Sequence, residues 1–76
     1  MTKLHVSNFI LKLSCALLIQ NRELSINEIK AFPYVDDEIA EIIKQALLKI
    51  FNSYLYQRKI PDSRIPQWEE VIILKE

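Results

Sequence analysis

Residues 24–36 read Leu-Ser-Ile-Asn-Glu-Ile-Lys-Ala-Phe-Pro-Tyr-Val-Asp, and the predicted fold is built outward from this stretch. Ser25 and Glu28 have the spacing of a capping box, in which the hydroxyl accepts a helix amide and the carboxylate reaches back to the cap. Pro33 disfavours helical geometry at the preceding residue, so this helix ends after about two turns. Asp36 then caps a second, longer helix. A short capped helix, a tight break and a longer helix predict a helix-turn-helix.

An apolar helix is predicted before this stretch, beginning at a cap on Ser7. Nearly every residue of Phe9–Ile19 is apolar, and a helix of that kind is buried on most of its faces. Asn21 is the expected left-handed residue after its last turn. Beyond Asp36, apolar residues recur at three- and four-residue spacing as far as Tyr54, which predicts an amphipathic helix. This helix either ends at Asn52-Ser53 or continues to Lys59.

The last quarter of the chain has two interpretations. A β-hairpin fits Tyr54–Ile60 and Glu70–Leu74, which are rich in aromatic and β-branched residues, with a type I turn at 60–63. The alternative is a helix that begins at Pro66. The β-branched run Val71-Ile72-Ile73 favours the hairpin. The predicted fold class is therefore a mainly α domain with a C-terminal β-hairpin, and the alternative is an all-α bundle of three or four helices.

The composition predicts one small domain over residues 1–76. Half of the residues are hydrophobic, there is one cysteine and no glycine, and ten basic residues balance ten acidic ones. One cysteine excludes an internal disulfide, and zero net charge gives no general attraction to nucleic acid or to a membrane surface. Because no apolar run reaches the roughly 18 residues of a membrane span, we expect a cytoplasmic protein that makes no membrane contact.

The sequence contains no recognisable catalytic constellation. His5 is the only histidine and lies near a terminus. Cys15 lies in the most apolar helix, where a buried and inert thiol is expected. No cluster of Cys and His is present to hold zinc, and without glycine there is no phosphate-cradling loop. We therefore expect a protein that is not an enzyme, with no metal, no cofactor and no small-molecule substrate.

The order of the predicted elements over residues 7–74 resembles a winged helix-turn-helix domain. Leu24-Ser25 with Glu28-Ile29 opens the second helix, Asp36 opens the third eleven positions after Ser25, and the hairpin follows. In that superfamily the third helix enters the DNA major groove and the hairpin, or wing, contacts the phosphate backbone. The resemblance therefore implies a small DNA-binding regulator of transcription. The implied DNA contacts are Lys44, Gln45 and Lys49 on the helix, with Arg58, Lys59 and Arg64 on the wing.

Two features depart from the winged-helix pattern. Four carboxylates crowd the start of the third helix, where they would repel phosphates: Asp36, Asp37, Glu38 and Glu41. Asn52 stands where a glycine usually precedes the wing.

A second set of segments is similar to the Hha/YmoA group of small helical proteins, which bind a nucleoid protein. These segments are Phe9-Ile10-Leu11-Lys12-Leu13, Glu23-Leu24-Ser25-x-Asn27-Glu28, Ile39-Ala40-Glu41 and Lys59-Ile60-Pro61-x-Ser63, with Trp68 beyond them. This resemblance implies an all-helical fold and a function in partner binding. It supports the alternative to DNA binding, which is a protein–protein interaction adaptor or a homo-oligomeric module without DNA contact.

Self-association is expected in either case. The first helix is apolar on more faces than a chain of 76 residues can cover, and large exposed apolar patches mark interfaces. A two-fold dimer is the commonest arrangement. The predicted interface consists of Phe9, Ile10, Leu13 and Leu17.

Overall fold

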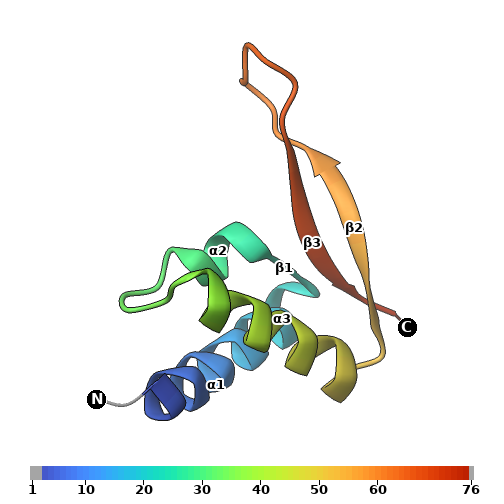
Figure 1. The fold of residues 1–76 in the computed structure, drawn as a ribbon. Helices are drawn as coiled ribbons and strands as arrows, with labels where there is room; N and C mark the ends of the chain where they lie inside the picture. Colours follow the sequence, from blue (N-terminus) through green and yellow to red (C-terminus); the bar gives the residue numbers. More distant parts are fainter. Residues whose placement is uncertain (1–2, 76) are drawn as a thin grey trace.

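The computed structural model describes the backbone of residues 3–75 and the side chains of residues 5–75. The elements follow one another as α1 (Lys3–Asn21), β1 (Glu23–Ser25), α2 (Ile26–Lys30), α3 (Asp37–Ile50), β2 (Ser53–Lys59) and β3 (Trp68–Leu74). About half of the chain is helical, and the strands form a three-stranded antiparallel sheet (Figure 1). The predicted hairpin is confirmed. The mainly α class and the all-helical bundle are wrong, because the hairpin recruits β1 into a sheet and the fold is mixed α/β.

The two predicted caps begin their helices as expected. Ser25 Oγ accepts the amide of Asn27 at 3.2 Å, and Asp36 Oδ1 accepts the amide of Ile39 at 2.8 Å. The capping box is incomplete, however. The Glu28 carboxylate is exposed and makes no hydrogen bond or ion pair with the described side chains of residues 5–75, whereas the Ser25 hydroxyl donates to Glu69, 44 positions along the chain. The Ser25 hydroxyl therefore makes both the local cap bond and a contact that is distant in sequence.

Helix α1 differs from its prediction at both ends. It starts at Lys3, so Ser7 lies inside the helix and is not its cap. Arg22, rather than Asn21, takes the left-handed conformation, with φ of 67°. The Arg22 amide still donates to the Leu18 carbonyl at 2.8 Å, so the helix continues one residue further than its sequence indicates.

The sheet has the strand order β1-β3-β2. Ile72 of β3 lies opposite Leu24 of β1 and Leu55 of β2, and this inner face of the sheet packs against the helices. The hairpin loop contains a tight turn in which Asp62 has φ of 67°. A positive φ at that position is typical of a type II turn, so the predicted type I geometry is wrong.

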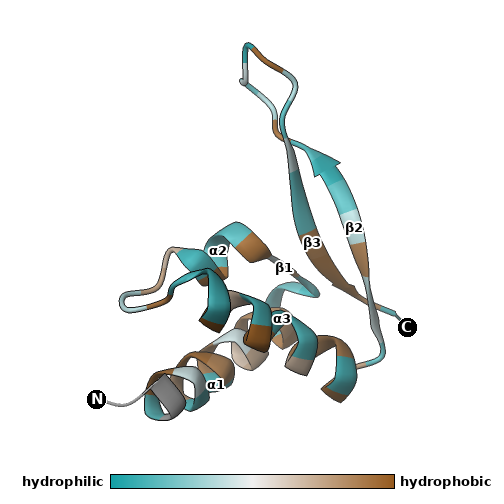
Figure 2. Cartoon of the chain, in the orientation of Figure 1, coloured by the Kyte–Doolittle hydropathy of each residue, from teal (hydrophilic) through white to brown (hydrophobic). Residues whose placement is uncertain are grey.

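The core lies between α1, α3 and the inner face of the sheet. Its buried side chains are Val6, Ile10, Leu18, Leu24, Ile26, Ile29, Ile39, Ala40, Ile43, Leu47 and Ile72. Figure 2 shows that the hydrophobic residues of β3 gather at its C-terminal end, beside the helices, and that the distal half of the hairpin is mostly hydrophilic, with hydrophobic positions in its loop. The hairpin consequently projects beyond the helical body.

Candidate functional site

Helix α3 carries the three residues predicted to face a DNA groove. Lys44 is the least exposed, with 12% of its side chain accessible, because its Nζ lies 2.9 Å from Glu41 Oε2 and 3.6 Å from Glu70 Oε1. The hydrogen bond to Glu41 is the main cause that raises the pKa of Lys44. The ammonium therefore joins α3 to β3 and is already paired with two carboxylates.

Gln45 and Lys49 are exposed on the same helix. The Gln45 side-chain amide donates to Glu41 Oε1 at 3.1 Å, so the Glu41 carboxylate binds both Gln45 and Lys44. Asp37, at the start of α3, is exposed and pairs with Lys30 at 3.6 Å. The start of the predicted recognition helix is thus acidic, and such charge repels phosphates.

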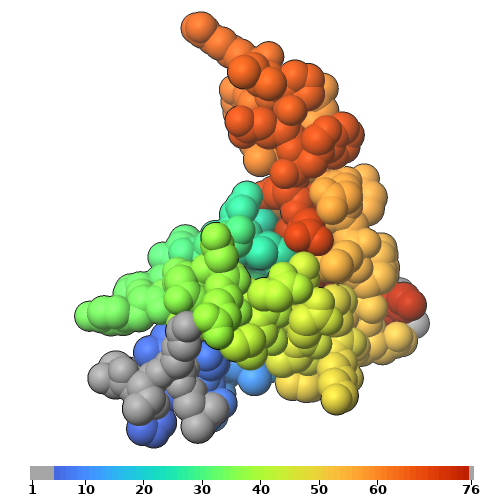
Figure 3. All heavy atoms as spheres, viewed as in Figure 1, coloured from blue at the N-terminus to red at the C-terminus, as the bar shows by residue number. Residues whose placement is uncertain are grey.

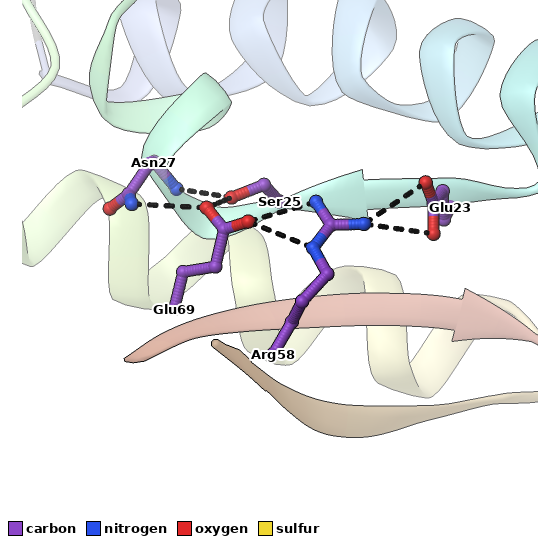
Figure 4. Close-up of polar contacts among 5 residues, drawn as sticks. All are labelled: Glu23, Ser25, Asn27, Arg58 and Glu69. Carbon is purple, nitrogen blue, oxygen red and sulfur yellow. Dashed lines mark hydrogen bonds and ion pairs between the residues drawn. The ribbon is translucent and has the colours of Figure 1, made fainter. Parts of the chain in front are cut away.

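Arg58 of β2 lies at the centre of a polar cluster on the outer face of the sheet, which we call the strand clasp (Figure 4). Its Nε and Nη2 each lie 2.9 Å from Glu69 Oε1, and its Nη1 donates to both carboxylate oxygens of Glu23 at 3.3 and 3.4 Å. Glu69 Oε2 in turn accepts Ser25 Oγ at 3.0 Å and Asn27 Nδ2 at 3.3 Å. The clasp therefore connects all three strands and the start of α2.

The clasp has an electrostatic consequence for both of its central groups. Hydrogen bonds from Arg58 and then from Ser25 lower the pKa of Glu69, and the bond to Glu69 raises the pKa of Arg58. Glu69 has 15% of its side chain exposed and Arg58 has 41%. Arg58 is consequently a structural cation that neutralises two carboxylates, and it is not an isolated wing charge.

Lys59 and Arg64 are exposed on the hairpin. Adjacent residues of a strand point to opposite faces, so Lys59 lies on the other face from Arg58 and opposite Trp68. Arg64 lies in the hairpin loop. The three predicted wing cations therefore do not form one patch.

The predicted dimer surface on α1 is only partly available. Ile10 is 3% exposed and belongs to the core, which corrects its place in the predicted interface, and Leu17 is half-buried. Phe9 and Leu13 remain exposed. They border an apolar groove of about 220 Å³, which we call the α1 groove. Its lining residues are Val6, Phe9, Ile10, Leu13, Phe32, Pro33 and Tyr34.

Sequence reasoning missed both the α1 groove and the strand clasp. The groove forms where α1 meets the turn at 32–34. The sequence contains no local signal for this contact beyond the three neighbouring bulky residues Phe32, Pro33 and Tyr34.

Within residues 3–75 there is no group of three or more His, Cys, Asp or Glu side chains arranged to hold a metal ion. Cys15 is partly buried, and this burial raises the pKa of its thiol. No helix in the described part of the chain has the length and apolar character to cross a membrane.

Comparison of the chain with protein-family models, with curated proteins and with solved structures finds no match.

Proposed function

We propose that this chain is a small, non-enzymatic regulatory domain of winged-helix type that binds a partner protein through the α1 groove. The observation that carries the proposal is the groove itself, an apolar hollow whose rim residues Phe9, Leu13 and Tyr34 are exposed. Exposed apolar patches of this kind mark interaction surfaces. The expected setting is the cytoplasm, with no cofactor.

The winged-helix description is supported by connectivity. The chain runs α1-β1-α2-α3-β2-β3, the sheet order is β1-β3-β2, and the short helix α2 is followed directly by the longer α3. Fold alone does not imply function, so the choice between DNA and protein depends on the surface residues.

The size and lining of the groove favour a protein partner. At about 220 Å³ it is smaller than the roughly 300–1,000 Å³ of typical small-molecule sites. Protein interfaces, by contrast, are often anchored by one or two large side chains in a desolvated pocket. The expected occupant is an apolar side chain of a partner protein.

DNA binding is the second candidate, and the projecting hairpin is the observation that favours it (Figure 3). The structure reduces the set of contact residues, because Lys44 and Arg58 are paired with carboxylates. The residues still exposed for DNA contact are Gln45, Lys49, Lys59 and Arg64.

The protein-binding proposal is tested by placing a photo-crosslinking amino acid at Tyr34, on the groove rim, and identifying its adducts in source cells. We expect one dominant protein adduct, and purified partner should bind the wild type. Leu13→Asp, which puts a charge on the rim, should weaken that binding at least tenfold. Ile65→Asp is the matched control, because Ile65 is exposed in the hairpin loop far from the groove. Equal binding by both variants would refute the proposal.

A further inference from the structure

Strand β2 forms an open edge of the sheet. It pairs with β3 alone, through seven consecutive residue pairs from Ser53↔Leu74 to Lys59↔Trp68. Figure 1 shows β2 on the side of β3 away from β1. An open edge exposes unpaired backbone N–H and C=O groups that can pair with another strand.

The hydrogen bonds that flank the ladder show which residues face this edge. The Ile60 amide donates to the Gln67 carbonyl at 2.8 Å, and the Lys75 amide donates to the Asn52 carbonyl at 2.8 Å. Both pairs continue the β2–β3 register, so even-numbered residues bond to β3. Because directions alternate in an antiparallel ladder, the odd-numbered residues point their backbone groups outward. These are Ser53, Leu55, Gln57 and Lys59.

The middle of the edge lacks the features that commonly protect edge strands. Protection usually comes from proline, a β-bulge, a very short strand or charged side chains. The register of β2 with β3 is continuous over seven pairs, and the segment Tyr54–Gln57 has neither proline nor charge. Tyr54, Leu55 and Tyr56 are all at least 38% exposed. The edge is therefore competent to pair.

We infer that β2 pairs antiparallel with β2 of a second copy of this chain, about a two-fold axis at Tyr56. Side chains that oppose each other in a sheet must lie on the same face. Odd-numbered residues of β2 in one copy must therefore lie opposite odd-numbered residues of β2 in the other, and even-numbered residues opposite even-numbered ones. Tyr56 is the midpoint of Ser53–Lys59, so full overlap meets this requirement. The register joins the two sheets into one of six strands.

Charge placement favours a second copy as the occupant. With the axis at Tyr56, Arg58 of one copy lies opposite Tyr54 of the other, and Lys59 lies opposite Ser53. No two like charges face each other across the edge. Arginine beside an aromatic ring is favourable, and the two Tyr56 rings form an aromatic cross-strand pair.

The backbone geometry is also complementary. In this register each outward-facing residue of one copy opposes an outward-facing residue of the other, as Leu55 opposes Gln57. Each such pair exchanges two hydrogen bonds, so the four pairs supply up to about eight. The inference is independent of the α1 groove, which remains open to a partner protein.

Sedimentation equilibrium over a micromolar to submillimolar concentration series tests this dimer. The variants place a charge of either sign at Tyr56, the residue on the two-fold axis. The wild type is expected at twice the 9.0 kDa chain mass. Tyr56→Lys and Tyr56→Glu should each be monomeric, since like charges meet on the axis, and their equal mixture should regain the dimer mass. Tyr34→Lys is the matched control, because Tyr34 is an exposed tyrosine of the α1 groove, and it should dimerise like the wild type.

A second variant keeps the test decisive if Tyr56 replacements disturb folding. Gln57→Pro removes an amide that points to the open edge and spares the β2–β3 ladder, so it should weaken dimerisation at least tenfold with helix content unchanged. In the wild type, the amides of Leu55 and Gln57 should exchange with solvent more slowly as concentration rises. A monomeric wild type, a Tyr56→Lys variant that still dimerises, a monomeric mixture of the swapped variants, or loss of the dimer in Tyr34→Lys would overturn the inference.

Discussion

Replacing Glu69 by alanine should destabilise the domain more than replacing any other residue of the strand clasp. The carboxylate accepts hydrogen bonds from Ser25 and Asn27 and holds the Arg58 guanidinium at 2.9 Å. Its loss leaves the hydroxyl of Ser25, a residue that is 5% exposed, without its acceptor. Hydrogen bonds to charged groups contribute about 1.5–3 kcal/mol in protected sites, and partial exposure reduces this value.

We expect Glu69→Ala to lower the free energy of unfolding by about 2 kcal/mol, which in a domain of this size lowers Tm by roughly 8–16 °C. The assay is urea unfolding followed by far-UV circular dichroism at neutral pH. A double-mutant cycle separates the two partners of Arg58. The Glu69–Arg58 coupling should be about 1 kcal/mol, because two guanidinium nitrogens contact one oxygen of a carboxylate whose side chain is 15% exposed.

The Glu23–Arg58 coupling provides the internal control. Glu23 is 46% exposed and lies 3.3 Å from the guanidinium, so this pair should contribute at most about 0.5 kcal/mol. Equal couplings for the two pairs, or a Glu69→Ala variant as stable as the wild type, would refute the view that the clasp holds the strands together.

Three further outcomes are expected from the packing and electrostatics. Ser25→Ala should lower the free energy of unfolding by about 1–2 kcal/mol through the lost helix cap, whereas Glu28→Ala should change the urea midpoint little. A larger effect of Glu28→Ala than of Ser25→Ala would show that the complete capping box forms in solution. Ser14→Ala should stabilise the fold by about 1 kcal/mol, because the buried Ser14 Oγ has no hydrogen-bond partner among residues 3–75; a lower urea midpoint would show that the hydroxyl is satisfied. The pKa values of Glu69 and Glu41 lie below the ordinary 4.5, so their contribution is complete above that pH and is lost as the pH falls through the lowered values. An acid titration of the thermal midpoint should show this decline in the wild type and a smaller one in Glu69→Ala.

Local signals explain which parts of the fold were predictable. Ser25 and Asp36 cap their helices through amides only two or three residues away, so a short window of sequence contains the whole interaction. The hairpin was predictable for the same reason, because its two strands are adjacent in the chain. The short strand β1 was not predicted, since Glu23–Ser25 becomes a strand only by pairing with β3.

The surface residues were less predictable because their partners are distant in sequence. The sequence pattern places Lys44 on the polar face of its helix, but in the fold its ammonium lies 3.6 Å from the Glu70 carboxylate of β3. Arg58 appeared to be a wing cation, but Glu23 lies 35 positions before it and joins the same clasp. Likewise, Phe32 and Pro33 form a groove only where their turn meets α1. Composition showed zero net charge, but it did not show which cations the carboxylates neutralise.

The choice between protein and DNA as the partner is tested most directly by a fluorescence anisotropy titration of labelled mixed-sequence duplex DNA. With Lys44 and Arg58 in ion pairs, we expect no saturation below about 100 μM protein at physiological salt, the weak end of non-specific affinity. The opposite result would be saturation at low micromolar protein, with a log–log salt slope near −3 per bound chain from Lys49, Lys59 and Arg64. That result would contradict the protein-binding proposal and establish the hairpin and α3 as a DNA-contacting surface.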